Sequence, residues 1–338
     1  MSRSVLGLDI GGANLKAAHV GGGVRTQPFE LWKNPAGLSA ALRLLLQELP
    51  VHDELAVTMT GELCDCFETK RQGVTAILDA VTAVAAGKPV WVWRNDGRLV
   101  DSAAARVEPL PVAAANWLAL ATFAVRFAPS GPALVVDVGS TTTDITPLLE
   151  GVPMPQGRTD TERLRRQELL YTGVRRTPVC ALLGPAGAAE FFATMLDVYL
   201  VLGKLPEDAN DRQTADGRPA TVAAAHARLA RMFCADLESS TETERRSLAM
   251  RVGNRQVTLI RQALERVSEN LPRPIDRLIV AGSGEFAARA ALDLLPEYGS
   301  RLSSVAEVIS LGDRLGPALS EAACAHAVAV LASEMAAP

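Results

Sequence analysis

The chain is poor in several residue types that would identify common functional classes. Of its 338 residues, 4% are aromatic, four are histidines and five are cysteines. The histidines, at positions 19, 52, 226 and 326, lack the spacing of a metal-ligand set. Cys64 and Cys66 alone cannot complete a tetrahedral zinc site. The sequence also lacks the nucleophile-elbow pattern of many serine hydrolases. It therefore favours neither a zinc centre nor a Ser-His-Asp hydrolase.

The chain also lacks a basic excess and a long apolar run. Its net charge of −4 provides no bulk attraction for nucleic acid or an anionic membrane. The most apolar stretch, residues 110–125, is rich in alanine and contains Asn116. It is short of the roughly 20 apolar residues that span a bilayer, so we expect a buried helix. We expect neither nucleic acid nor membrane as a partner. Most of the clustered arginines are expected on a solvated helix face: Arg163, Arg165, Arg166, Arg175 and Arg176.

The cysteine content predicts a reducing compartment. Five cysteines are an odd number for a disulfide framework in a chain of this length. Cys180, Cys234 and Cys324 are scattered, as small buried side chains often are. The N-terminus runs directly into a strand-like segment, without the pattern of a secretory leader. We therefore expect a cytoplasmic protein with free thiols.

The length and the alternation of elements predict a two-domain α/β protein. A chain of 338 residues is long for one hydrophobic core, and strand-like and helix-like segments alternate. Residues 129–132 (Pro-Ser-Gly-Pro) are the expected hinge, which divides the chain into domains 1–129 and 130–338. A closing helix at 317–335 is expected to pack back on the N-terminal domain. The other predicted helices are 38–49, 69–86, 111–127, 160–171, 219–235 and 241–270.

The most informative feature is a strand–turn–strand pattern that occurs twice. Residues 6–16 and 135–145 each contain an apolar run, an aspartate, a turn rich in Gly or Ser/Thr, and a second apolar run. Glycine lets consecutive N–H groups converge on an anion, and the aspartates, Asp9 and Asp137, can hold a divalent cation against it. Two such hairpins facing each other predict a cleft that binds a polyphosphate between the domains.

The order of these motifs resembles the superfamily of actin, Hsp70 and the sugar kinases. A third strand enters a glycine turn at residues 278–284. The resemblance implies a two-domain actin-like (ASKHA, ribonuclease-H-like) fold with a phosphate-binding cleft between the domains. It assigns the first phosphate loop to Asp9, Gly11, Gly12, Asn14 and Lys16. It assigns the second to Asp137, Gly139, Ser140, Thr141, Thr142 and Asp144, and an adenosine-type motif to Gly282, Ser283 and Gly284.

Ala13 departs from the pattern of many kinases in this superfamily. Those enzymes have a threonine after the glycine pair, where its hydroxyl contacts phosphate. Lys16 is a plausible point charge for the same phosphate. The first loop is therefore expected to bind a diphosphate without the usual arrangement for ATP.

Four further segments narrow the resemblance to one family. They are TMTGELCDCF at 58–67, KRQG at 70–73, PVAAANW at 111–117 and LYTGVRRTP at 170–178. Together with the first loop, they resemble hydantoinase/oxoprolinase-like proteins of tetrahydromethanopterin-linked one-carbon transfer. The archaeal relatives are enzymes of methanofuran biosynthesis. They join an aminomethylfuran-methyl diphosphate to the phenol of γ-glutamyltyramine and release pyrophosphate. The resemblance covers nearly the whole chain.

The family resemblance implies a transferase with a defined division of roles. Backbone N–H groups of both loops, Lys16 and a Mg²⁺ near Asp9 and Asp137 would neutralise the departing pyrophosphate. Asp144 or Glu62 would accept the phenolic proton. Arginine binds phosphates and carboxylates in bidentate fashion, which suits Arg71, Arg175 and Arg176 for the substrate's phosphate or glutamyl carboxylates. ATP is compatible with the cleft, but this scheme does not require it.

Two other functions remain open at this stage. One is an ATP-dependent small-molecule kinase, or an oxoprolinase/hydantoinase-type ATPase, of the same fold. The other is a non-catalytic sensor that binds nucleotide in the cleft. The sequence also leaves open whether the acceptor is tyramine-like, a free tyrosine or a glutamylated one, and whether the protein forms a homodimer.

Overall fold

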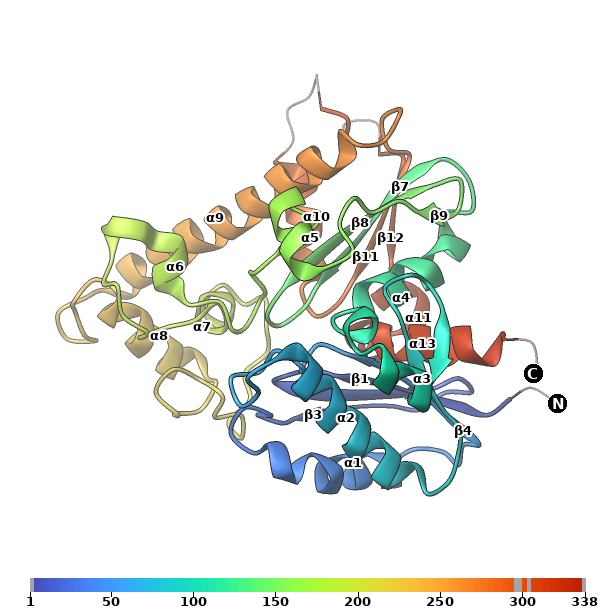
Figure 1. Ribbon diagram of the computed structural model, residues 1–338. Coiled ribbons are helices and arrows are strands. Elements are labelled where there is room, and N and C mark those ends of the chain that lie inside the picture. Colours follow the sequence, from blue (N-terminus) through green and yellow to red (C-terminus); the bar gives the residue numbers. More distant parts are fainter. Residues whose placement is uncertain (1–2, 295–299, 303–304, 336–338) are drawn as a thin grey trace.

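Two mixed β-sheets, one from each half of the chain, organise the computed structural model, which describes residues 3–294, 300–302 and 305–335 (Figure 1). The first sheet has the order β3 (Val24–Pro28), β2 (Asn14–His19), β1 (Val5–Ile10), β4 (Glu54–Met59), β5 (Val90–Trp93) and β6 (Leu99–Asp101). The second has the order β10 (Leu169–Leu170), β8 (Thr143–Leu149), β7 (Pro132–Val138), β11 (Arg277–Ala281) and β12 (Glu307–Ser310), with β9 (Val152–Pro153) also paired to β8.

The two sheets share one topology. In the first, β1, β2 and β3 form antiparallel pairs, and β4 and β5 extend the sheet in parallel from β1. In the second, β7, β8 and β9 are antiparallel, and β11 and β12 are parallel to β7. An antiparallel meander extended by two parallel strands is the ribonuclease-H-like arrangement. Its occurrence in both halves confirms the predicted actin-like α/β fold.

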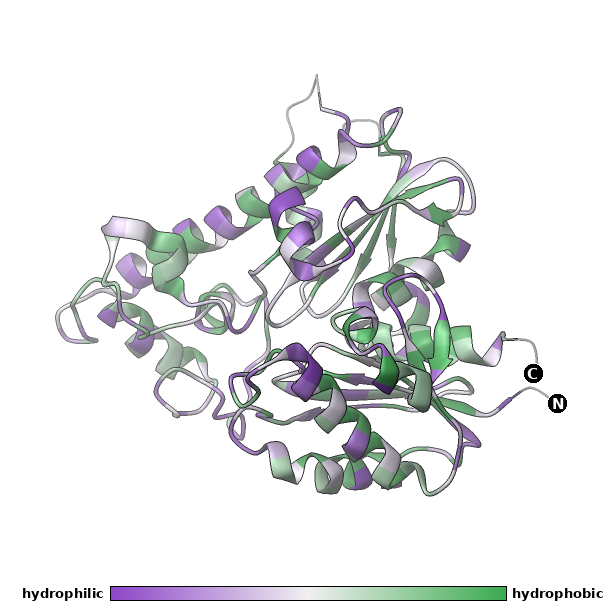
Figure 2. Ribbon diagram, viewed as in Figure 1, coloured by the Kyte–Doolittle hydropathy of each residue, from purple (hydrophilic) through white to green (hydrophobic). Residues whose placement is uncertain are grey.

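Each sheet is covered on its outer face by helices of its own half (Figure 1). In the first half, α1 (Leu38–Gln47) and α2 (Lys70–Ala85) bury apolar side chains against the strands, and α3 (Ser102–Val107) packs beside α2. In the second half, α9 (Glu242–Ser268) and α10 (Glu285–Asp293) pack against the strands, and α7 (Met195–Val201) and α8 (Val222–Arg231) pack against α9. Hydrophilic and hydrophobic residues alternate along α9, as expected for a helix with one solvated face (Figure 2).

Between the sheets lies a shared apolar layer. It contains α4 (Asn116–Ala124) and α13 (Ala323–Ser333), with side chains of β7 and β11 packed against them. The close approach of α13 to β1 depends on Gly7, because a Cβ there would lie 1.9 Å from the carbonyl oxygen of Ala325. The sheets therefore hold a fixed spacing, and the turns at the ends of β1 and β7 share one cleft. No helix among the described residues is both long and apolar enough to cross a bilayer.

The helix predicted at 111–127 is α-helical only in α4, because Ala113 is extended and Ala114 has a φ of 46°. Two further predicted helices end differently in the structure. The segment expected at 160–171 forms α5 (Asp160–Arg166), after which Gln167 adopts a φ of 60° and β10 pairs with β8. The segment expected at 317–335 is divided into α12 (Pro317–Glu321) and α13, with Ala322 between them. In both cases a break in the helical hydrogen bonding, without a Gly or Pro to mark it, was invisible in the sequence pattern.

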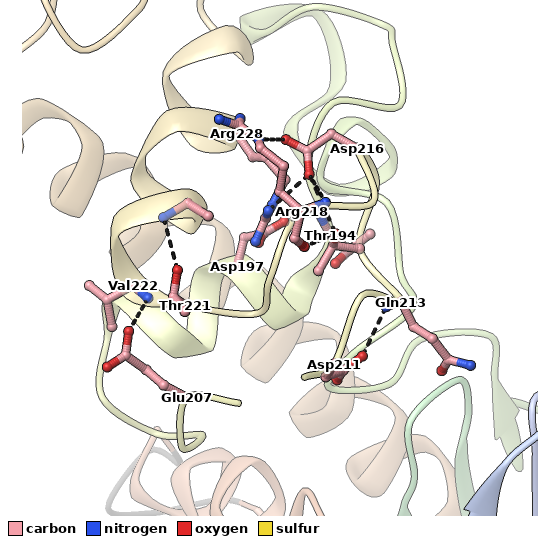
Figure 3. Close-up of polar contacts among 12 residues, drawn as sticks. Thr194, Asp197, Glu207, Asp211, Gln213, Asp216, Arg218, Thr221, Val222 and Arg228 are labelled. Carbon is pink, nitrogen blue, oxygen red and sulfur yellow. Dashed lines mark hydrogen bonds and ion pairs between the residues drawn. The ribbon is translucent and has the colours of Figure 1, made fainter. Parts of the chain in front are cut away.

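A buried ionic network joins α7 to α8 and to the loop between them (Figure 3). Arg228 of α8 is fully buried and contacts Asp197 of α7 at 2.7 Å and Asp216 of the loop at 3.0 Å. The same loop carries Asp211, which pairs with Arg175 beside the second phosphate turn. The network therefore fixes a loop that also contacts the cleft.

We predict that Arg228→Met lowers the free energy of unfolding by about 3–5 kcal/mol, because it leaves Asp197 buried without its cation. Urea unfolding measures this change. Arg231→Met on the exposed face of the same helix is the matched control, with an expected change within about 0.5 kcal/mol. Equal effects of the two substitutions would contradict a stabilising role for the network.

Candidate active site between the two sheets

The two predicted phosphate turns have the same geometry. In the first, the N–H of Gly11 donates to the carbonyl of Asn14 at 3.0 Å, and in the second, Gly139 donates to Thr142 at 2.9 Å. Asp9 lies opposite Lys16 in the β1–β2 pair, and Asp137 lies opposite Asp144 in the β7–β8 pair. The turns are thus equivalent by register. They differ in one charged position, where the first half has Lys16 and the second has Asp144.

The third glycine turn also has a counterpart in the first half. Gly284 donates its N–H to the carbonyl of Val138, as Gly61 donates to that of Ile10. Gly282 has a φ of 88°, and a Cβ there would lie 2.4 Å from Asp137 Oδ1. Glycine is therefore required where this turn crosses the second phosphate turn.

Asp9, which is buried, and the half-buried Lys16 and Asp137 form a charged group at the base of the turns. Burial raises the pKa of Asp9 to about 6 and that of Asp137 to about 7, although Lys16 opposes both shifts. Burial lowers the pKa of Lys16, but the charges of Asp9 and Asp137, with smaller effects of Cys324 and Glu321, together outweigh it, and the net pKa is raised. Lys16 Nζ also donates to the carbonyl of Glu321 at 2.7 Å. The group contains more acidic than basic side chains.

These carboxylates suit a hard divalent cation whose remaining ligands are substrate oxygens. Asp9 Oδ1 is buried and has no hydrogen-bond partner within the described residues. Asp137 Oδ2 accepts a long contact of 3.8 Å from the thiol of Cys324. No set of three His, Cys, Asp or Glu side chains forms a metal site in the part of the chain that the structure describes. Mg²⁺ commonly takes one or two carboxylates together with substrate phosphates.

A cavity of about 490 Å³ opens beside the turns, with walls from both halves. Of the predicted site residues, Gly12, Thr141, Thr142, Asp144 and Arg176 line it. Asp9, Lys16, Asp137 and Glu62 are not lining residues, and Arg71 is exposed on α2. Arg175 is engaged by Asp211.

Arg163 is a site residue that the sequence analysis placed elsewhere. It was expected on a solvated helix face, but it is 1% exposed, lines the cavity and contacts Asp144 Oδ1 at 2.7 Å. Its guanidinium also lies 4.0 Å from the ring centroid of Trp117. Arg165 and Arg166 are exposed, as expected. One signal in the sequence could have indicated this position. Arg163 follows Asp160 by three residues on the same helix, so the two side chains share a helix face.

The segment 170–178 packs directly on the second phosphate turn. The backbone N–H groups of Arg175 and Arg176 donate to the carbonyl of Ser140. Gly173 permits this contact, because a Cβ there would lie 2.5 Å from backbone atoms of residues 139–141. Arg176 then extends across the cleft, 4.4 Å from the ring centroid of Trp32 in the first half. Trp32, which the sequence analysis did not single out, and the 69% exposed Tyr171 both line the cavity.

Glu62 is a buried acid beside the cavity. It is 1% exposed, and its Oε2 has no hydrogen-bond partner within the described residues. Burial raises its pKa to about 7, an effect that hydrogen bonds from its own N–H and that of Ala114, together with the charge of Lys70, only partly offset. Ala114 and Cys64, which adjoin it, are lining residues.

We predict that Glu62→Gln makes stability less dependent on pH. A folded-state pKa of about 7, against an ordinary 4.5, means that ionisation of Glu62 destabilises the fold as pH rises. The advantage of the variant over the wild type should be absent near pH 4.5 and reach about 3 kcal/mol above pH 7. Chemical unfolding across this range measures it. Glu68→Gln, at an exposed carboxyl, is the control, and parallel profiles for wild type and Glu62→Gln would refute the prediction.

Comparisons with known proteins support the same family. A model of the hydantoinase/oxoprolinase family matches residues 53–296. A relative from Methanocaldococcus jannaschii, named (4-{4-[2-(γ-L-glutamylamino)ethyl]phenoxymethyl}furan-2-yl)methanamine synthase, is 32% identical over 98% of both chains. A protein of the same name from Methanococcus vannielii is 32% identical over 59% of this chain and 89% of its own.

A solved structure supports the fold alone. Nucleotide-free acetone carboxylase, at 10% identity, aligns with 92% of this chain and 51% of its own, with a TM-score of 0.50. The family model covers most of the present chain, and the archaeal relative aligns from end to end. The chain therefore belongs to the hydantoinase/oxoprolinase family.

Proposed function

We propose that the protein is an enzyme of methanofuran-type cofactor biosynthesis. It joins an aminomethylfuran-methyl diphosphate to the phenol of a glutamyltyramine- or tyrosine-type acceptor and releases pyrophosphate. The observation that carries the proposal is the 32% identity, over 98% of both chains, to a synthase whose named product contains this aryl ether. Two equivalent turns beside one cavity are the arrangement that a diphosphate substrate requires.

The turns hold the diphosphate. The backbone N–H groups of residues 12, 13, 140 and 141 donate no hydrogen bond in the described part of the chain and are available for its oxygens. Lys16 adds a positive charge. Asp9 and Asp137 would hold a Mg²⁺. When bound, the ion offsets the negative charge that develops on the leaving group. Lys16, together with a Mg²⁺ held by Asp9 and Asp137, would thus stabilise pyrophosphate more strongly as it departs than while it is esterified.

The reaction exchanges one carbon–oxygen bond for another. The bond between the furanylmethyl carbon and the diphosphate oxygen breaks, and its electron pair leaves with pyrophosphate. The electron-rich furan stabilises the resulting carbocation. The phenolic oxygen then forms the ether bond and loses its proton. Since that oxygen becomes strongly acidic as the bond forms, a carboxylate of ordinary basicity is sufficient to accept the proton.

Asp144 is better placed than Glu62 to accept this proton. Asp144 lines the cavity, and Arg163 fixes its orientation through Oδ1. Its Oδ2 has one long contact of 3.4 Å, from the hydroxyl of Thr142, and so remains available. Glu62 is not among the lining residues, and no group in the described part of the chain orients its Oε2.

Arg176 is the best of the predicted arginines for the acceptor's carboxylates. It lines the cavity together with the rings of Trp32 and Tyr171, which can flank a phenyl group. Arg175 is paired with Asp211, and Arg71 lies outside the lining. The acceptor therefore enters beside Arg176, with its phenol toward Asp144.

We predict product formation without nucleotide. The purified enzyme, freed of bound nucleotide, is mixed with the furan diphosphate, a phenolic amine or amino acid, and Mg²⁺. Ether product and pyrophosphate should appear in equal amounts, as measured by mass spectrometry and a pyrophosphate assay. Strict dependence on ATP, with ADP formed in step with product, would instead support the kinase or ATPase alternative.

We further predict that Asp9→Asn and Asp137→Asn lower kcat by about 10²–10³-fold, and that metal removal abolishes turnover until Mg²⁺ is restored. Both substitutions remove a desolvated charge, so neither should lower the melting temperature. Asp53→Asn, at an exposed position, is the control. Near-wild-type rates in both variants, or full activity in excess chelator, would show that the carboxylates are structural.

A further inference from the structure

Glu62 in the first half and Glu285 in the second half occupy equivalent positions. Comparing them shows which hydrogen-bond donors Glu62 lacks. Asp9 and Asp137 are equivalent, and their parallel partners are Thr58 and Ala281. Counting forward from those partners places Glu62 at the position of Glu285 in the second half. The matching hydrogen bonds of Gly61 and Gly284, one residue earlier, support this alignment.

Glu285 is fully satisfied within the protein. Its Oε1 accepts from the N–H of Gly312 at 2.8 Å and from the hydroxyl of Ser320 at 2.5 Å, and its Oε2 accepts from the hydroxyl of Ser310 at 2.5 Å. Glu62 has no such set, since its Oε2 is buried without a partner among the described residues. A buried carboxylate in this condition costs several kcal/mol unless a ligand provides the missing donor.

The surroundings of Glu62 have an unbalanced negative charge. Asp160 at the start of α5 and Lys70 at the start of α2 both act on it electrostatically. Lys70 Nζ is 4.0 Å from Asp160 Oδ2, the outer limit of an ion pair. Arg163 and Asp144 also act on Asp160, but they form an ion pair with each other. Glu62 and Asp160 therefore share Lys70, which leaves one negative charge to be matched. Asp160 itself lines the cavity.

We propose that Glu62 and Asp160 form a subsite for a primary ammonium group, and that this group is the aminomethyl substituent of the furan diphosphate. The inference rests on the proposed function for the identity of the ligand. An ammonium would supply Glu62 with the donor it lacks and balance the charge that Lys70 leaves unmatched.

Position selects the furan amine over the amine of the acceptor. Gly61 abuts the first phosphate turn, where its Cβ would lie 3.2 Å from the backbone of Gly11. Glu62 is therefore adjacent to the place where the diphosphate binds. The furan carries its amine and its diphosphate on one small rigid ring, so both ends reach these neighbouring groups. The glutamyl amine lies beyond the phenyl ring and the ethyl linker, and therefore nearer Arg176.

The test compares the furan diphosphate with an analogue in which methyl replaces aminomethyl. The wild type should prefer the amine substrate by about 10–100-fold in kcat/KM, the value of one or two charge-assisted hydrogen bonds. Glu62→Gln and Asp160→Asn should lower kcat/KM for the amine substrate while leaving that of the analogue nearly unchanged. Glu68→Gln is the control, and it should keep the wild-type preference.

A loss of kcat/KM that is equal for both substrates would overturn the subsite, because a structural role for Glu62 does not discriminate between them. A binding measurement separates this result from failure of the proposed function. Calorimetry uses unreactive analogues of the amine and methyl compounds, in which a methylene group replaces the ester oxygen between the furanylmethyl carbon and phosphorus. It should show the same 10–100-fold preference in Kd, lost in Glu62→Gln. Turnover of both diphosphates without such a preference refutes the subsite alone. Binding preference without turnover refutes the proposed reaction alone.

Discussion

The desolvation of two carboxylates beside a single lysine is the constraint on which the cleft depends. Asp9 and Asp137 come from different sheets, and the apolar layer formed by α4 and α13 holds those sheets at a fixed spacing. Desolvation makes their charges costly, as their raised pKa values show. A divalent cation bridged to a diphosphate relieves that cost. The folded protein thus holds unfavourable energy at the point where its proposed substrate would supply compensating charge.

The two halves share one topology, and several of the residues proposed to act on substrate differ between equivalent positions. The hydrogen bonds that close the turns are the same, yet Lys16 occupies the position that Asp144 has in the other half. In the first half Lys16 therefore favours binding of the diphosphate anion, whereas in the second half Asp144 is a carboxylate oriented by Arg163. Glu62 and Glu285 differ in the same way, since one is unsatisfied and the other is held by three donors. The shared topology sets where these side chains lie, and the residue type at each equivalent position determines what the side chain can bind.

The sequence predicted the turns well because their information is local. Glycines and aspartates at the ends of short apolar runs specify both the hairpins and their place in the sheet. The partners of those turns were not visible in the same way. Arg163 is buried only because Asp144, on a distant strand, and Trp117, in the other half, both contact it. Trp32 reaches the cavity only because Arg176 meets it across the cleft. Such contacts depend on how the sheets are placed, which no spacing within one segment reveals.

The packing of residues 170–178 links the two ends of the cavity. The carbonyl of Ser140 accepts from Arg175 and Arg176, so the backbone that presents N–H groups to a phosphate also positions the arginine proposed to bind the acceptor. Arg176 then contacts Trp32 of the first half, and Lys70 approaches Asp160 in the opposite direction, from the first half to the second. Each half therefore contributes to recognition at both ends. A change in the spacing of the sheets would therefore weaken the diphosphate and acceptor contacts together. Both substrates are held in a reactive geometry only at one spacing of the two sheets.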